Sequence, residues 1–302
     1  MYNGILLLNK EPGFTSHDAV AKLRGILRFR RIGHAGTLDP MAQGLLVMLL
    51  GKATRASEYA SGAEKEYTAD FILGVETDTQ DTTGNVLAEA PVDVTESQLR
   101  QALSSFEGGY DQVPPMYSAI QKDGVRLYDL ARKGKEVERE SRFIALPLLE
   151  LLSFDPPRGK LRVRCSKGTY IRTLCHDLGQ RLGCGGAMSA LTRVQAGDFS
   201  LEDALTLGEV EQLVKEGTLQ QHILPADRLF ASLPAVTLTE EGAKRARNGA
   251  HAAQKHLLSG AIPPVDSLCR VYTPEGEFLM TGKGGLLDMG PPAIFCHKIF
   301  GE

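Results

Sequence analysis

The 302-residue sequence contains no tryptophan, and aromatic residues make up only 6% of it. Its five cysteines form no C-x-x-C pair, and an odd number of scattered thiols favours a reducing compartment over a disulfide framework. The apolar run Ile5 to Leu8 is too short for a signal-peptide core or a membrane span. We therefore expect a soluble, unexported, cytoplasmic protein without membrane attachment, whose cysteines are small core residues.

Motifs for metals and for phosphate-binding loops are also missing. The segment TDTQDTTG carries Asp78 and Asp81 but lacks the spacing and the terminal glutamate of a calcium loop. GKGG at 282–285 lacks the flanking residues of a P-loop, and the seven histidines show no H-x-x-x-H pair with a third ligand. We expect no metal site and interpret GKGG as a turn.

The charge pattern is uneven although the net charge is only -3. Glu58 to Asp111 holds twelve acidic and two basic residues, whereas Arg158 to Arg193 holds eight basic residues and one acidic residue. Residues 19–38 add five basic residues and no acid. Such segregation predicts one positive face and one negative face, and a positive face could attract a polyanion such as RNA. Ordinary solvated charges are the alternative, and charge alone leaves both open.

Hydrophobic patterning predicts an α/β protein of one large or two ordinary domains. Thr15 and Ser16 can cap a basic, amphipathic helix with apolar positions 20, 23, 26 and 27. The run LLVMLL at 45–50 has the length of a buried strand, and residues 67–73 alternate as a half-buried strand. Residues 34–40 should therefore lie in a loop that leads into the core.

The second half of the sequence predicts an insertion, a strand and a helix. KDG at 122–124 marks a turn before a short helix that ends near Gly134, and residues 121–145 predict a projecting, mobile, basic insertion. A strand at 161–165 precedes a helix from Ile171 to Leu182. Arg172 falls in its first turn, beside the positive end of the helix dipole, so we expect it to have an anionic partner.

From about Leu233 the sequence changes to short strands with Gly and Pro turns, including a hairpin at 274–276. A helical stretch at 205–214 precedes it. This pattern predicts a second, β-rich domain of about 70 residues.

The segment GHAGTLDPMAQG, from Gly33 to Gly44, contains the strongest candidate for chemistry. Asp39 lies between Leu38 and Pro40 in a glycine-shaped loop, where a carboxylate has the restricted freedom that a nucleophile or an acid/base group needs. A turn in which Asp39 bonds the local backbone is the alternative, and in isolation the pattern favours that turn.

The pattern G-H-x-G-T-L-D-P-x-A-x-G-x-L is very similar to the signature of the TruB family of tRNA pseudouridine-55 synthases, and a pattern of this length is specific. The resemblance extends along nearly the whole chain, through KEYTADFILG at 65–74, TDTQDTTG at 77–84, PPMYSAIQKDGVRLYDLARKG at 114–134 and CSKGTYIRTLCHDLG at 165–179. The resemblance therefore favours Asp39 as a candidate catalytic residue over a turn residue.

The resemblance implies a role for each of six residues. Asp39 is the essential carboxylate, which either attacks ribose C1' or takes a proton from the sugar, and Arg172 is its ion-pair partner. Tyr67 stacks on the flipped uracil and handles the C5 proton. Tyr170 and Leu191 line the base pocket, and His34 fills the space that the base leaves. The alternatives are a surface cation for Arg172, strand or core positions for Tyr67 and Leu191, and a backbone-bonded loop residue for His34.

The resemblance also implies the architecture: a mixed, largely antiparallel sheet flanked by helices over residues 1–230, the pseudouridine synthase fold, and a small PUA-like RNA-binding domain over 231–302. We expect a monomeric isomerase that needs no cofactor, acts on the T arm of tRNA and flips the target base. The alternatives are a tRNA-binding folding chaperone without chemistry and a glycoside hydrolase, which would require a second catalytic carboxylate near Asp39.

Overall fold

The computed structural model describes residues 2–287 and 290–301. Its main sheet has eight strands. Six run in the order β1 (Gly4–Lys10), β3 (Gln43–Leu50), β13 (Gly186–Ala196), β4 (Lys65–Leu73), β12 (Arg158–Cys165) and β11 (Leu148–Asp155), while β2 (Ile32–Ala35) pairs with β3 and β14 (Phe199–Ser200) with β13. Every pairing is antiparallel except that between β3 and β13. The prediction of a mixed, largely antiparallel sheet is therefore confirmed.

The pair β3–β13 forms a narrow seam in this sheet. It is registered at only two positions, Thr192 opposite Gln43 and Arg193 opposite Gly44. Gly44 has a φ of +98°, and a Cβ atom added to it would lie 2.4 Å from the carbonyl oxygen of Arg193. The backbones can therefore approach this closely only because residue 44 is glycine.

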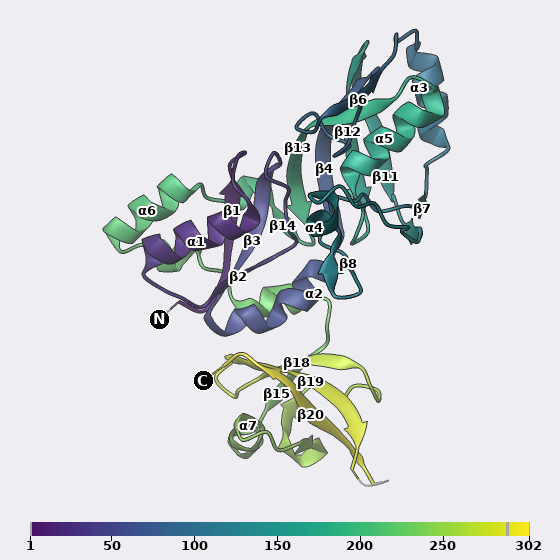
Figure 1. Ribbon diagram of the computed structural model, residues 1–302. Coiled ribbons are helices and arrows are strands. Elements are labelled where there is room, and N and C mark those ends of the chain that lie inside the picture. The colour runs from purple at the N-terminus through teal and green to yellow at the C-terminus, as the bar shows by residue number, and fades with distance from the viewer. Residues whose placement is uncertain (1, 288–289, 302) are drawn as a thin grey trace.

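The described residues form seven α-helices. They are α1 (Ser16–Leu27), α2 (Ser57–Gly62), α3 (Glu96–Ser104), α4 (Leu127–Ala131), α5 (Ile171–Leu182), α6 (Leu207–Glu216) and α7 (Glu240–Arg247). Of these, α1 and α6 lie at one end of the main sheet and α3 and α5 at the other (Figure 1). Short 3₁₀ helices occur at η1 (Gly51–Ala56), η2 (Leu201–Asp203), η3 (Leu219–His222), η4 (Ala226–Phe230) and η5 (Gln254–His256). As expected, Thr15 caps α1 through a capping box with Asp18, and Gly183 ends α5 in the left-handed conformation.

Strand β3 explains how the core is divided. Its side chains alternate between two buried clusters: Leu46 and Met48 belong to the larger one, and Leu45 and Val47 to the smaller one. A strand covered on both faces requires a continuous apolar run, which is what LLVMLL supplies. Four of the five cysteines are buried core residues, as predicted, while Cys296 is half-buried.

Three small sheets complete the first part of the chain. They pair β5 (Val75–Thr77) with β6 (Val86–Glu89), β7 (Tyr110–Gln112) with β10 (Arg142–Ile144), and β8 (Gln121–Lys122) with β9 (Val125–Arg126). The last of these, with α4, is the predicted insertion, and its hairpin turns at Asp123 and Gly124, which both have positive φ. In Figure 1 it projects from the sheet beside β4.

A β-rich unit follows, as predicted (Figure 1). Its sheet runs in the order β16 (Ala252–Ala253), β20 (Pro292–Ile299), β19 (Phe278–Leu286), β18 (Leu268–Tyr272), β15 (Ala235–Leu238) and β17 (Leu257–Ser259). It has its own core, in which helix α7 packs through Ala243 and Ala246. We call this unit the C-terminal barrel.

The C-terminal barrel is joined to the main sheet by aromatic contacts. Phe300 is 1% exposed and belongs to the smaller core cluster of the main sheet. Its ring centroid lies 5.4 Å from that of Phe230 and 5.2 Å from that of Phe278. Arg55 donates a hydrogen bond of 2.7 Å to the carbonyl of Ile299. The end of the chain is thus packed into the first part of the fold.

Candidate active site

The loop that carries Asp39 connects β2 to β3 and is shorter than predicted. Ile32 to Ala35 pair with β3, so His34 and Ala35 lie on a strand, and the loop begins at Gly36. The prediction that the whole segment 34–40 is a loop is therefore wrong at its start. The apolar residues Ile32 and Ala35 favour a strand because both are buried against β3.

The backbone on both sides of Asp39 is held by side chains from β1 and α1. The hydroxyl of Ser16 accepts a hydrogen bond from the Leu38 amide at 2.9 Å and donates one to the Leu38 carbonyl at 3.2 Å. The ammonium of Lys10 donates to the carbonyl of Pro40 at 3.4 Å and to that of Phe14 at 2.6 Å. These bonds restrict the loop, as a positioned carboxylate requires.

Asp39 forms the expected ion pair with Arg172 from the first turn of α5. The guanidinium Nη2 of Arg172 lies 3.3 Å from Oδ1 of Asp39 and donates a hydrogen bond of 2.7 Å to the carbonyl of Tyr117. Desolvation raises the pKa of Asp39 above its ordinary value, and the positive charge of Arg172 opposes that rise. Arg172 is 7% exposed, so the alternative of a surface cation is wrong.

Arg172 also approaches a second carboxylate. Its Nη1 lies 3.9 Å from Oδ2 of Asp81, which is 5% exposed. Asp81 accepts hydrogen bonds from Thr79 and from the amide of Thr83, both at 2.9 Å. It does not line the cavity that Asp39 lines. Asp81 is therefore bonded within its own loop rather than directed at a bound sugar, as a glycoside hydrolase would need.

Five of the six predicted site residues surround one cavity of about 410 Å³. They come from a loop, two strands and the start of a helix: Asp39, Tyr67 of β4, Leu191 of β13, and Tyr170 and Arg172 at α5. We call this space the Asp39 cavity. Its lining also includes Tyr117, Ser118 and Ala119, and the insertion at 121–145 contributes Tyr128 to the wall. His34 is not among the lining residues, and its Nδ1 is buried without a hydrogen-bond partner.

The position of Tyr170 depends on Gln112, a residue that sequence analysis missed. The side-chain amide of Gln112 accepts a hydrogen bond from the Tyr170 amide at 2.8 Å and donates one to the Tyr170 carbonyl at 3.1 Å. It also donates to the hydroxyl of Tyr110, which in turn donates to Asp177 of α5. Gln112 is 1% exposed, so this buried network holds the start of α5 where Tyr170 and Arg172 reach the cavity.

Arg193 is a second residue that sequence analysis did not select. It is 1% exposed, and its guanidinium donates to the carbonyl of Leu45 at 2.6 Å and to that of Gly36 at 2.9 Å. Burial raises the pKa of Tyr67 above its ordinary value, and the nearby positive charge of Arg193 opposes that rise. Arg193 thus ties the start of the Asp39 loop to β3, in the cavity that Tyr67 also lines. Its partners Leu45 and Gly36 lie 148 and 157 positions away in the sequence, so no local pattern indicates this role.

Basic residues of the predicted positive face pair with acidic residues on a neighbouring strand. Strand β12, from the basic segment, pairs with β4, from the acidic segment. Glu66 bonds Arg162 at 2.6 Å and Arg164 at 2.8 Å, and Lys160 lies 3.2 Å from Asp70. For these strands the prediction of separate charged faces is wrong, because antiparallel pairing places the opposite charges side by side.

Two absences concern only the part of the chain that the structure describes. No group of three or more His, Cys, Asp and Glu side chains there could hold a metal ion. Among the helices of residues 2–287 and 290–301, none is long and apolar enough to cross a membrane.

Comparison with known proteins identifies the fold and the family. Residues 24–171 match the family model described as TruB family pseudouridylate synthase (N terminal domain), and residues 172–231 match that of the tRNA pseudouridylate synthase B C-terminal domain. The chain belongs to the TruB family. The tRNA pseudouridine synthase B of Opitutus terrae is 54% identical over 70% of this chain and 88% of its own length. That of Pseudomonas aeruginosa is 47% identical over 80% of both chains.

A solved structure supports the same assignment for the fold. A chain of an H/ACA ribonucleoprotein bound to a substrate RNA containing 2'-deoxyuridine is 26% identical to this chain, with a TM-score of 0.75. The match covers 99% of this TruB-family chain and 85% of that chain. The predicted pseudouridine synthase fold with a β-rich C-terminal unit is therefore confirmed.

Proposed function

We propose that this TruB-family enzyme converts a uridine of the tRNA T loop, position 55, to pseudouridine in the Asp39 cavity. The observation that carries the proposal is the ion pair of Asp39 and Arg172, 133 positions apart in sequence, in one cavity with Tyr67, Tyr170 and Leu191. TruB relatives named tRNA pseudouridine synthase B support the choice of tRNA. Extrusion of the uridine from the T loop costs a few kcal/mol, and stacking on Tyr67 offsets part of it.

The reaction breaks the bond between uracil N1 and ribose C1', turns the base and joins C5 to C1', while the C5 proton leaves and N1 gains one. It is redox-neutral and adds no group, so the proposal needs no cofactor. Asp39 acts on the ribose, by attack on C1' or by removal of a sugar proton, and Arg172 favours its ionised form. Tyr67 stacks on uracil and handles the C5 proton.

Other residues orient the base. Tyr170 and Leu191 border the base pocket, and His34, at the end of β2, fills the space that the flipped uridine leaves in the RNA. The insertion at 121–145 closes over the RNA, and its Tyr128 in the wall of the Asp39 cavity supports this role.

The proposed domain division places the catalytic domain at 1–230 and a PUA-like RNA-binding domain at 231–302. The separate core and six-stranded sheet of the C-terminal barrel support this boundary. We further propose that the enzyme acts as a monomer in the cytoplasm, with the tRNA T arm as its partner.

The test is tritium release from a T-arm stem-loop that carries C5-tritiated uridine at position 55. Because the rearrangement replaces the C5 hydrogen by a bond to C1', each turnover should release one tritium to water. RNA that binds the protein and releases no tritium would overturn the proposal.

A tRNA-folding chaperone remains the rival from another class, and Asp39→Asn separates the two. The enzyme should lose pseudouridine formation by at least about 10³-fold, with RNA affinity retained, because the amide keeps the shape but not the charge. If pseudouridine formation by Asp39→Asn equals that of the wild type, Asp39 is not the catalytic carboxylate.

A further inference from the structure

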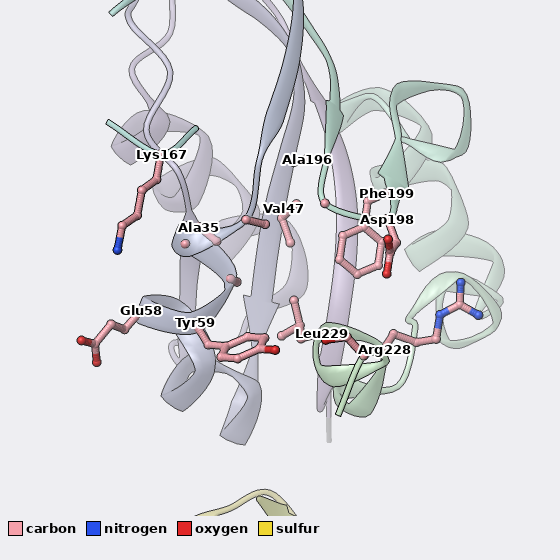
Figure 2. A pocket seen from close by; sticks show the side chains of 15 residues that line it. Ala35, Val47, Glu58, Tyr59, Lys167, Ala196, Asp198, Phe199, Arg228 and Leu229 are labelled. Atoms are coloured by element: carbon pink, nitrogen blue, oxygen red, sulfur yellow. The ribbon is translucent and has the colours of Figure 1, made fainter. Parts of the chain in front are cut away.

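The structure contains a second cavity, of about 540 Å³ (Figure 2). Ala35 and Lys167 line this second cavity, and the residues that follow them, Gly36 and Gly168, line the Asp39 cavity. Since consecutive Cα atoms are about 3.8 Å apart, the walls of the two cavities meet at these two points. The two cavities therefore lie within reach of one RNA strand.

Small residues leave this second cavity open. Ala60, Ala63 and Ala196 line it together with Gly197, whose φ is +56°. Its volume lies within the usual range of about 300–1,000 Å³ for sites that bind small organic groups. The structure therefore provides room for a group of nucleoside size beside the proposed uridine pocket.

Tyr59 gives this cavity an aromatic surface. It is 36% exposed, and its ring centroid lies 4.6 Å from that of Phe230, which supports it from one side. Figure 2 shows the Tyr59 ring at the edge of the cavity, next to Leu229. A supported, exposed ring beside an aliphatic wall is suited to the flat face of a nucleobase, because stacking requires no particular base edge.

Two cations border the cavity from opposite sides, Lys167 and Arg228 (Figure 2). Two acids also line it, Glu58 and Asp198, but Glu58 lies 3.8 Å from Lys298 of the C-terminal barrel. A cation on each side suits a ligand with a phosphate before and after its base, as a nucleotide within a strand has.

We propose that this cavity binds one further unstacked base of the RNA whose target uridine occupies the Asp39 cavity. Tyr59 stacks on that base, and Lys167 and Arg228 contact the phosphates on its two sides. The proposal rests on the proposed function, because it takes RNA as the substrate. We call this space the Tyr59 subsite.

The test combines removal of the Tyr59 ring from the protein with removal of single bases from the RNA. Dissociation constants are measured for T-arm stem-loops in which one loop nucleotide at a time is abasic, with wild type and Tyr59→Leu. At one loop position other than the target, loss of the base should weaken wild-type binding by about 5- to 150-fold. Tyr59→Leu should weaken binding of the intact loop similarly and add little further loss at that position.

Two control variants separate the subsite from a general loss of structure. Tyr59→Phe keeps the ring and should bind the intact loop nearly as well as wild type. Ala63→Leu fills the cavity without removing an aromatic or a charge, and should reproduce the behaviour of Tyr59→Leu. Urea denaturation confirms that both leucine variants are folded.

Additive effects of Tyr59→Leu and base removal at every loop position would overturn the subsite. Tritium release from the intact loop, measured in the same samples, reports the proposed function separately. Release with additive binding effects rejects only the subsite, whereas tight binding without release rejects the proposed function.

Discussion

The Asp39 cavity and the C-terminal barrel differ in how their residues are drawn from the chain. The cavity is lined by residues between Gly36 and Arg193, from loops, three strands and three helices. The barrel is built from the continuous segment 235–299 and has its own core. Changes at the cavity should therefore alter rate while the fold persists, whereas changes where the barrel docks should alter stability and leave the chemistry of a bound stem-loop intact.

The largest effect on rate outside Asp39 is expected for Arg172→Met. It leaves two carboxylates, Asp39 and Asp81, without their shared cation, so the ionised form of Asp39 loses the positive charge that favours it. The single-turnover rate on a T-arm stem-loop should fall by about 10²- to 10³-fold. Arg172→Lys is the matched control, which keeps the charge and should retain part of the rate. Equal rates for wild type and Arg172→Met would contradict the proposed role.

Phe300→Ala tests the contact between the C-terminal barrel and the main sheet. The buried ring packs on Phe230 and Phe278, and its removal should lower the free energy of unfolding by about 3 kcal/mol, measured by urea denaturation. The single-turnover rate on saturating stem-loop should stay within about twofold of wild type. A large fall in that rate would show that the docked barrel shapes the Asp39 cavity.

Arg193→Lys lies between these cases, because Arg193 is structural and borders the cavity. The guanidinium of Arg193 bonds the carbonyls of Leu45 and Gly36 through two different nitrogens. A lysine ammonium cannot reach both, so one buried carbonyl loses its hydrogen-bond partner. The free energy of unfolding should fall by about 1–3 kcal/mol. We also expect a lower single-turnover rate with little change in RNA affinity. An unchanged rate in a destabilised variant would make Arg193 a residue of the fold only.

The smallest effect is a pH dependence of stability. Because the pKa of Asp39 is raised in the fold, the folded protein holds a proton that the unfolded chain has lost between the ordinary and the raised value. The contribution of Asp39 to the free energy of unfolding therefore falls as pH rises through that interval. Urea denaturation across this range should show the fall for wild type and its absence in Asp39→Asn. Identical pH profiles would contradict the direction of the shift.

Local signals in the sequence predicted the elements that carry the site. The cap at Thr15, the apolar run of β3 and the glycine after α5 act within a few residues, so pattern and propensity suffice to find them. The anionic partner of Arg172 was also expected, since a cation in a first helical turn is otherwise unfavourable. The identity of that partner came from the family resemblance, not from the helix.

What the sequence did not predict depends on contacts between distant segments. Gln112 and Tyr170 are 58 positions apart, and nothing near Gln112 indicates that its amide will bond the start of α5. The prediction of separate charged faces was wrong for the same reason. The acidic and basic segments are separate along the chain, but β4 and β12 are neighbours in the sheet. Glu66 therefore forms ion pairs with Arg162 and Arg164.

The narrow seam between β3 and β13 has a consequence for how the chain can vary. The backbone contact at Gly44 and the buried side chain of Arg193 meet at one place, next to the loop that carries Asp39. Any side chain at position 44 would separate the strands at that point. In a library randomised at this codon and selected for activity, glycine should be almost the sole survivor, while the exposed neighbour Gln43 should accept many substitutions.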